Sequence, residues 1–130
     1  MSNIKLFQDK KIRSVWDEEK EQWYFSVVDV VAALTDSSDP KQYIKKMRAR
    51  DPQLNANWGT ICTPVQMTAL DGKSRRIMAS DIKGLFRLIQ SIPSPKAEPF
   101  KLWLSQVGYE RVLEIENPEL AQERMKVLYE

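Results

Sequence analysis

The stretch FSVVDVVAALTDSSDPKQYIKKMRAR, residues 25–50, decides the fold because it encodes two short helices separated by a polar turn. In its first half, Ser26 and Asp29 stand three residues apart, as in a capping box at the start of a helix. Valines and a leucine follow at the spacing of one helical face, and the pattern ends after Leu34. The first half therefore predicts an apolar helix that starts directly after Ser26.

The second half of this stretch predicts a basic helix. Asp39 followed by Pro40 supplies an N-cap and a proline at the first helical position, where proline is tolerated. Tyr43, Ile44 and Met47 share one face of that helix. Its positive side chains occupy the remaining surface: Lys41, Lys45, Lys46, Arg48 and Arg50. Two helices joined by about three residues, the second of them basic, are typical of a helix-turn-helix that binds DNA.

A second basic cluster lies on a predicted β-hairpin. The strand-like residues 65–70 and 73–79 flank Asp71-Gly72, and this dipeptide favours a two-residue type I′ turn. Such a turn places three positive side chains at or beside the tip of the hairpin: Lys73, Arg75 and Arg76. A basic hairpin can reach a DNA groove or a phosphate backbone, but it can also merely keep an edge strand soluble.

Charge is distributed unevenly along the chain, although the net charge of all 130 residues is only +2. Residues 40–76 carry eight basic side chains against two acidic ones, whereas residues 110–130 carry six acidic side chains against three basic ones. Binding to phosphates depends on the local potential, so the small total does not exclude a nucleic-acid partner. Charged helix faces are also common as solvated surface, which is the alternative for each cluster taken singly.

The composition is that of one soluble domain, with 42% hydrophobic and 29% charged residues. The first ten residues lack the apolar segment of a signal peptide, and no apolar run is long enough to cross a bilayer. The single cysteine, Cys62, cannot form an internal disulfide and is expected to be a small buried residue. We therefore expect a protein of the reducing cytoplasm with no membrane partner.

The remaining pattern predicts an α+β domain with a small antiparallel sheet. Residues 4–7, 12–15 and 23–25 are typical of short strands that precede the two helices. Residues 51–59, which follow the basic helix, are expected to be irregular. Trp58 would then be an exposed aromatic side chain that can stack on a base.

The last third of the chain is expected to be helical. Ser80 should cap one helix that ends before Pro93, and Ser94 followed by Pro95 should open the next. Gly108 is a candidate interruption of that second helix. These helices form the C-terminal helical segment of the predicted fold.

No catalytic or cofactor site is predicted. The chain has no histidine, which excludes a Ser-His-Asp triad, a Cys-His pair and most zinc sites. Its sequence contains no glycine-rich phosphate-binding motif. The densest acidic group, residues 17–21, is expected on an exposed loop, so a metal-dependent nuclease is the weakest alternative. We expect a protein that is not an enzyme and that holds neither a cofactor nor a metal ion.

Two blocks of the sequence resemble the Bro-N domain, the N-terminal domain of phage and prophage antirepressors and of the baculovirus BRO proteins. The second block, GLFRLIQSIPSPKAEPFKLW at residues 84–103, is the more distinctive, and the resemblance covers roughly residues 4–107. The first block matches through these residues: Phe7, Arg13, Val15, Trp23, Tyr24, Phe25, Asp29, Val30 and Leu34. The resemblance implies a DNA-binding module that is usually joined to a separate C-terminal region.

The segment from Asn117 to Met125 resembles more particularly the bacterial DNA-damage-inducible D proteins, in which further sequence follows a Bro-N domain. We expect residues 1–115 to form the Bro-N-like domain. Residues 116–130 would begin a C-terminal helical extension of a longer protein.

The leading prediction is a non-catalytic domain that binds double-stranded DNA, with single-stranded DNA as a further possibility. Lysines would contact phosphates, and Arg48, Arg75 or Arg76 would contact base edges. The alternative is a protein–protein regulatory module that engages a repressor or a DNA-repair protein through an acidic amphipathic helix at residues 118–130. Either module could form an oligomer.

Overall fold

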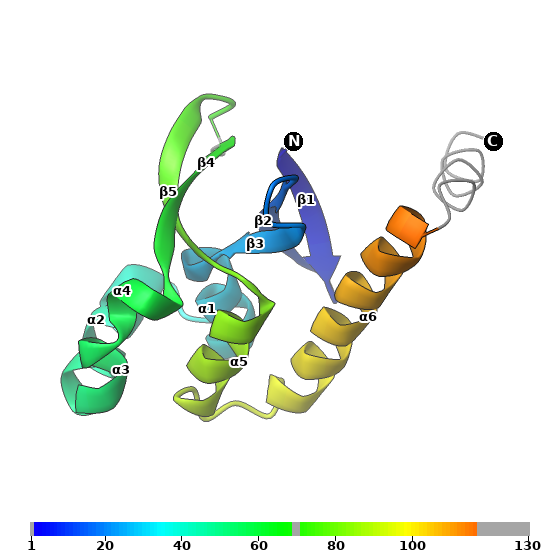
Figure 1. Ribbon diagram of the computed structural model, residues 1–130. Helices are drawn as coiled ribbons and strands as arrows, with labels where there is room; N and C mark the ends of the chain where they lie inside the picture. The colour runs from blue at the N-terminus through cyan, green and yellow to red at the C-terminus, as the bar shows by residue number, and fades with distance from the viewer. Residues whose placement is uncertain (1, 69–70, 117–130) are drawn as a thin grey trace.

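The computed structural model describes residues 2–68 and 71–116, in which five antiparallel strands form one sheet in the order β1-β2-β3-β5-β4 (Figure 1). The strands are β1 (Ser2–Phe7), β2 (Lys10–Asp17), β3 (Gln22–Ser26), β4 (Thr63–Thr68) and β5 (Ser74–Ser80). The helices are α1 (Val27–Thr35), α2 (Pro40–Arg50), α3 (Pro52–Ala56), α4 (Trp58–Ile61), α5 (Ile82–Gln90) and α6 (Ala97–Glu116). The predicted α+β class is confirmed, including the two-helix pair and the C-terminal helical segment.

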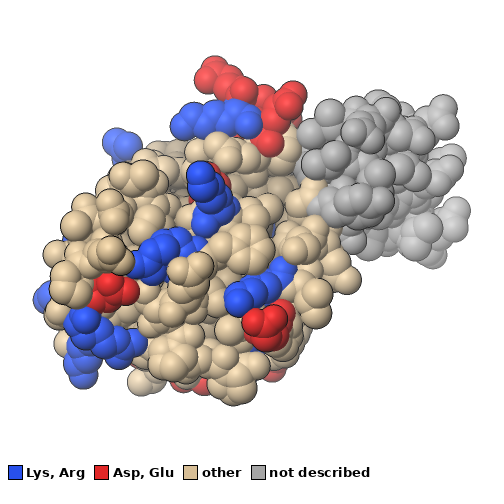
Figure 2. Space-filling model, turned by 60° about the horizontal axis from the view of Figure 1, so that its bottom comes forward, with Lys and Arg blue, Asp and Glu red and all other residues tan. Residues whose placement is uncertain are grey.

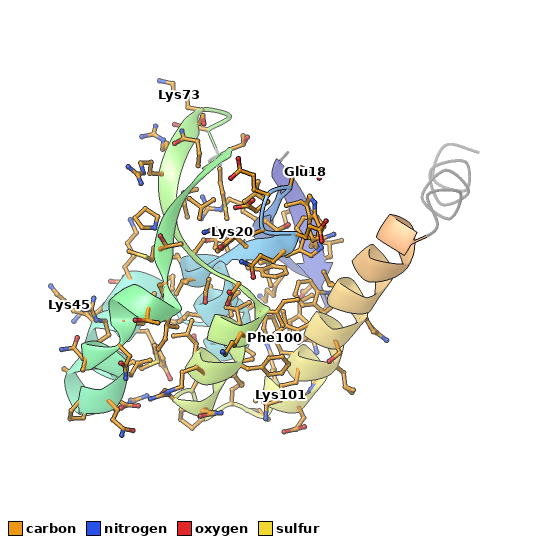
Figure 3. The ribbon with its side chains drawn as sticks, viewed as in Figure 1. Glu18, Lys20, Lys45, Lys73, Phe100 and Lys101 are labelled. Atoms are coloured by element: carbon orange, nitrogen blue, oxygen red, sulfur yellow. The ribbon has the colours of Figure 1, made fainter. Side chains whose placement is uncertain are left out.

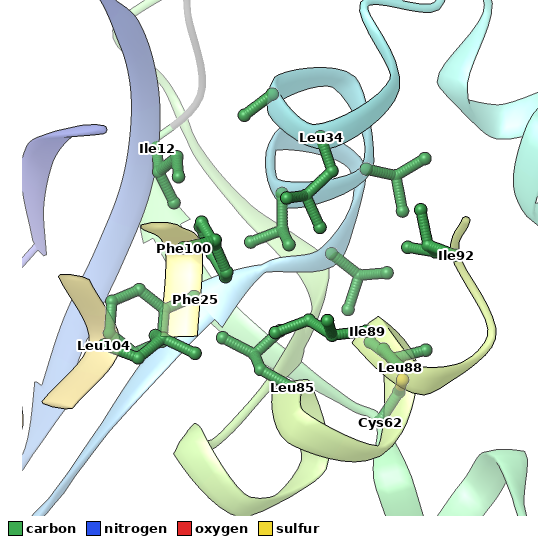
Figure 4. Packing of buried hydrophobic residues seen from close by; sticks show 14 of the residues in the cluster. Ile12, Phe25, Leu34, Cys62, Leu85, Leu88, Ile89, Ile92, Phe100 and Leu104 are labelled. Carbon is green, nitrogen blue, oxygen red and sulfur yellow. The ribbon is translucent and has the colours of Figure 1, made fainter. Parts of the chain in front are cut away.

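The main core lies between the sheet and helices α1, α5 and α6 (Figure 4). Phe25 from β3 and Phe100 from α6 are its largest fully buried side chains. The rings of Phe7 and Phe100 meet edge to face with centroids 5.0 Å apart, which fastens β1 to α6. Trp103 of α6 also donates a hydrogen bond of 2.8 Å to the backbone oxygen of Leu6 at the edge of the sheet.

The β4–β5 hairpin extends beyond the rest of the sheet (Figure 1). β5 pairs with β3 through only two residue pairs, whereas it pairs with β4 through six. β4 also contacts β2, although two strands lie between them in the sheet, so the sheet curls. Inside this curl, Met67 and Ala79 of the hairpin pack on Tyr24 in a second, smaller core. The hairpin is therefore packed from Ala79 at its base to Met67 near its tip, and the loop beyond the Thr68–Ser74 pair projects.

β3 passes into α1 without a loop, and three side chains fix the change of direction. The Ser26 hydroxyl accepts a hydrogen bond of 3.4 Å from the Asp29 backbone, as predicted for the N-cap. The Asp29 carboxylate accepts hydrogen bonds from the backbone, Nε and Nη2 of Arg13 on β2, at 2.9, 2.7 and 2.9 Å. These hydrogen bonds raise the pKa of the Arg13 guanidinium. The residues expected to form a capping box thus also join α1 to the sheet.

The prediction that residues 51–59 are irregular is wrong, because they contain α3 and the first half of α4. Asp51 followed by Pro52 repeats the signal of Asp39 followed by Pro40. The Asp51 carboxylate accepts a hydrogen bond of 3.0 Å from the Leu54 backbone and caps α3. The local signal for this helix was present in the sequence, but the helix is too short to show an apolar period.

Two expectations for the last third of the chain are also wrong. Ser80 belongs to β5 and donates a hydrogen bond of 2.6 Å to the backbone oxygen of Ile61, while Asp81 caps α5. Gly108 does not interrupt α6, which begins at Ala97 and continues to Glu116. The helix predicted at residues 118–130 and the segment that resembles the D proteins lie outside the described residues.

We expect Asp29→Ala to lower the free energy of unfolding by about 2–3 kcal/mol, since it leaves the Arg13 guanidinium without its partner. The two side chains are only 15% and 16% exposed. Asp29→Asn should cost less because the amide oxygen still accepts one hydrogen bond. Urea denaturation measures both values, and Asp9→Ala, at an exposed position, is the control. A loss below about 0.5 kcal/mol for Asp29→Ala would contradict this role.

Gly84→Ala should destabilise the domain by roughly 1–3 kcal/mol, although alanine normally favours a helix over glycine. A Cβ atom at Gly84 would overlap Ser80 Oγ and lie 2.6 Å from the backbone oxygen of Ile61. Gly59→Ala is the matched control, because nothing lies within 4 Å of a Cβ atom there. Thermal denaturation should show a lower melting temperature for the first variant and an equal or higher one for the second.

Candidate nucleic-acid interface

Helix α2 forms because its N-cap and its apolar face both favour a helix over the same residues. Asp39 accepts a hydrogen bond of 3.2 Å from the Gln42 backbone, and Pro40 occupies the first turn. Met47 is fully buried in the main core, which leaves the opposite side of the helix in solvent. Lys45 points away from the body of the protein (Figure 3). The exposed side of α2 is therefore its basic side, as predicted.

An open groove of about 510 Å³ follows the length of α2 and reaches α3. It brings together three of the predicted site residues, Lys41, Lys45 and Arg48, at positions that share one side of the helix. The other lining residues are Asp39, Gln42, Ile44, Ala49 and Asn55. Asp39, the N-cap residue, is the single acidic residue among them, so the groove is predominantly basic.

Arg48 is held in place by residues that follow α2. Its Nε donates a hydrogen bond of 2.9 Å to Asn55 Oδ1. Its guanidinium carbon lies 4.7 Å from the centre of the Trp58 ring. Trp58 is only 8% exposed, so its expected role as an exposed stacking residue is wrong. Asn55 and Trp58 were missed as supports of the site because they reach Arg48 only once α3 and α4 have folded.

Arg50 and the cap of α3 attach the end of α2 to α5. Asp51 Oδ2 accepts a hydrogen bond of 2.9 Å from the Ser91 hydroxyl and lies 3.5 Å from Nη2 of Arg87. Arg50 Nη2 donates to the backbone oxygen of Ser91 at 3.4 Å, and its guanidinium lies over the Tyr43 ring. Arg50 is therefore exposed but also serves to hold α2 against the domain.

The tip of the β4–β5 hairpin differs from the predicted turn. Thr68 pairs with Ser74, so five residues separate the paired strands instead of the two of a type I′ turn. Asp71 accepts hydrogen bonds from the Lys73 backbone and from Arg75, and Gly72 supplies the positive φ of 84°. Of the Asp71-Gly72 dipeptide, only Gly72 adopts the left-handed conformation, whereas a type I′ turn would need it at both residues.

The three basic residues of the hairpin do not share one face. Arg75 lies opposite Met67 and forms an ion pair with Asp71, whereas Arg76 lies opposite Gln66 on the other face. Lys73 lies at the far end of the hairpin, well separated from Lys45 on α2 (Figure 3). The two predicted basic clusters are therefore distinct, and a ligand that contacts both must extend along the molecule.

Several basic side chains outside α2 form ion pairs with acidic ones. Basic and acidic side chains are interspersed on the face shown in Figure 2. Among the ion pairs are Lys96 with Asp36, Lys101 with Glu98, and Arg87 with Asp51. By contrast, no acidic side chain among the described residues forms an ion pair with the five basic residues of α2: Lys41, Lys45, Lys46, Arg48 and Arg50. The positive potential of α2 is thus not neutralised locally.

Other chemistry has little support in the described part of the chain. Burial raises the pKa of the Cys62 thiol to about 12, so it is protonated at neutral pH and is a poor nucleophile. No group of three or more His, Cys, Asp or Glu residues lies close enough to hold a metal ion in residues 2–68 and 71–116. Over the same residues, no helix is long and apolar enough to span a membrane.

Stability should fall in acid because Asp51 and Asp36 are ionised partners. Hydrogen bonds from Leu54 and Ser91 lower the pKa of Asp51, and Lys96 lowers that of Asp36, both from an ordinary value of 3.8. A lowered pKa stabilises the folded state above the ordinary value, and this contribution is lost as the pH falls through the folded-state pKa. Urea denaturation from about pH 7 to pH 2.5 should show a plateau and then a loss below about pH 4.5. Asp51→Asn should lose less stability over that acidic interval; an unchanged acid loss would contradict the assignment.

Comparison with known families agrees with this architecture. The model of the N-terminal domain of the BRO family, Bro-N, matches residues 11–119, which include all of β2 except Lys10, strands β3 to β5 and the six helices described above. Neither curated proteins nor solved structures gave a significant match. Since the family model covers far more than half of the 130 residues, the chain belongs to the Bro-N family.

Proposed function

We propose that this Bro-N domain is a non-catalytic DNA-binding domain of a regulatory protein of the phage-antirepressor or DNA-damage-inducible type. One observation carries the proposal: Lys41, Lys45 and the half-buried Arg48 line an open groove, and no basic residue of α2 forms an ion pair with an acidic residue of the described chain. Buried or paired charges are common in folded domains, whereas a row of unpaired positive charges along one helix suits a polyanion.

The dimensions of α2 suit the major groove of a duplex. Its eleven residues span about 16 Å, and the major groove is about 12 Å wide and admits a helix. Lys41, Lys45 and Lys46 would contact phosphates on the two sides of the groove. The buried face of α2 is held by the core, so the helix would enter the groove as a rigid element.

The β4–β5 hairpin supplies a second contact. Arg76 lies on its exposed outer face, and Lys73 lies at its tip (Figure 3). Because this arm is separate from α2, a stiff duplex can contact both elements while it follows the length of the molecule. We propose that the hairpin binds the flanking phosphate backbone.

Double-stranded DNA is favoured over single-stranded DNA by the position of the aromatic residues. Proteins that bind single strands without sequence preference stack bases on exposed aromatic side chains. Trp58, the candidate for this role, is buried beneath Arg48. Cys62 is a free cysteine and forms no disulfide, which suits the reducing cytoplasm in which we propose that such a regulator acts.

Lys45→Ala combined with Lys46→Ala should weaken binding to every duplex sequence. The logarithm of affinity falls with the logarithm of salt concentration by about 0.9 for each phosphate contact, so the slope should become less steep by about 1.8. Fluorescence anisotropy of the 130-residue chain with a random duplex, at several salt concentrations, measures both quantities.

Lys83→Ala combined with Lys101→Ala is the matched control, because it removes two helical lysines from α5 and α6 instead of α2. This control should keep the wild-type salt slope. Equal slopes for both double variants would remove α2 from the interface. Absence of salt-dependent binding by the wild-type chain would instead favour the protein–protein regulatory module.

A further inference from the structure

We propose that Arg48 gives the DNA interface its base preference by recognising a guanine in the major groove. This role rests on the DNA binding proposed above and adds a specificity-determining residue with a defined target. Of the four arginines in the two basic clusters, Arg50 already donates from Nη2 to the backbone oxygen of Ser91. The other three are candidates for base contact, and their surroundings differ. Arg48 is distinguished by the way in which its guanidinium is held.

Two contacts fix the plane of the Arg48 guanidinium. Asn55 Oδ1 accepts a hydrogen bond of 2.9 Å from Nε of the Arg48 guanidinium. The Trp58 ring lies 4.7 Å from the guanidinium carbon, and Trp58 is itself held in the main core. An arginine oriented in this way loses little further freedom when it binds a ligand. Its geometry is therefore set before DNA arrives.

The remaining donors of Arg48 are available to a ligand. No described residue accepts a hydrogen bond from Nη1 or Nη2, and Arg48 lines the open groove of about 510 Å³. Asn55 also lines this groove, and because its oxygen is engaged by Arg48, the amide nitrogen is what it offers to a ligand. The site thus presents a set of donors and requires a ligand with adjacent acceptors.

The other arginines are less suited to this task. Arg75 is engaged by Asp71 at the hairpin tip. Arg76 lies on an exposed strand face with no described contact that fixes its guanidinium. The lysines of α2 offer a point charge on a flexible chain, which suits phosphates more than base edges. Arg48 alone among these side chains has an oriented pair of donors beside the exposed face of α2.

Guanine fits this donor pair better than the other bases do. In the major groove, its O6 and N7 are two adjacent acceptors that receive a bidentate hydrogen bond from arginine. Adenine presents a donor beside its N7, and cytosine presents a donor, so both would face the donors of Arg48 unfavourably. A phosphate also accepts bidentate bonds, but it carries no base preference. The test must therefore separate a base contact from a phosphate contact.

The experiment selects duplexes from a random library with the 130-residue chain and then measures affinities for the enriched site. We expect a preferred guanine whose replacement by another base costs roughly 5- to 150-fold in affinity. Replacement by 7-deazaguanine, which lacks the N7 acceptor, should also weaken binding. Inosine keeps O6 and N7 and should bind nearly as well as guanine.

Arg48→Ala should abolish the guanine preference. Arg48→Lys should only reduce it, because lysine still donates to guanine O6 or N7 but lacks the oriented fork, and the salt slope should stay near that of the wild type. Asn55→Ala should reduce the preference in part, since it releases Nε of Arg48. Lys45→Ala is the matched control, because Lys45 lines the same groove. It should lower the affinity for duplexes of every sequence alike while the preference for guanine remains. Thermal denaturation of each variant shows that it is folded.

The outcomes separate this assignment from the proposed function itself. If Arg48→Ala keeps the guanine preference, or if 7-deazaguanine binds as well as guanine, the assignment is wrong while DNA binding stands. If Arg48→Ala weakens every sequence equally, as Lys45→Ala does, Arg48 contacts a phosphate and the assignment is again overturned. If the wild-type chain binds no duplex at all, the proposed function fails as well.

Discussion

The ion pair between Arg13 and Asp29 is the interaction on which the arrangement of the domain depends. β3 ends at Ser26 and α1 begins at the next residue, so no loop can absorb an error in direction. Asp29 accepts three hydrogen bonds from Arg13, while Ser26 caps the helix and accepts a further bond from Arg13 Nη2. A partly buried carboxylate with this many donors is stable only in one orientation. The axis of α1 relative to the sheet is thereby fixed, and with it the position from which α2 starts.

The orientation of α2 is then fixed at both ends by contacts distant in sequence. At its start, Asp36 ends α1 in the left-handed conformation and forms ion pairs with Lys96 and Lys10. At its end, Asp51 joins α3 to Ser91 and Arg87 of the α5 region. Hydrophobic burial supplies the stability of this region, while these polar contacts determine where the basic face of α2 points.

Much of this could be predicted from local sequence, and the failures have a common physical cause. Ser26, Asp39 and the apolar positions of α1 and α2 act within one turn of their own helix, so the starts of both helices were predictable. Trp58 and Asn55 depend on contacts with Arg48, which exist only after α3 and α4 fold back against α2. Ser80 has the composition of an N-cap but is bound to Ile61 instead. Local signals therefore predicted the basic elements, whereas the side chains that orient Arg48 required the tertiary structure.

The two basic elements differ in rigidity, and this difference fits a division of labour on DNA. The α2 helix is packed on the core and tied at both ends, so a side chain such as Arg48 can keep the geometry that base recognition requires. The β4–β5 hairpin pairs with β3 through only two residue pairs and packs on Tyr24 through Met67 and Ala79 in the smaller core, while its loop with Lys73 lies farthest from the main core. Phosphate contacts tolerate small displacements because they depend mainly on charge and distance. A projecting arm with Lys73 and Arg76 can therefore adjust to the backbone of a duplex without disturbing the helix that determines sequence preference.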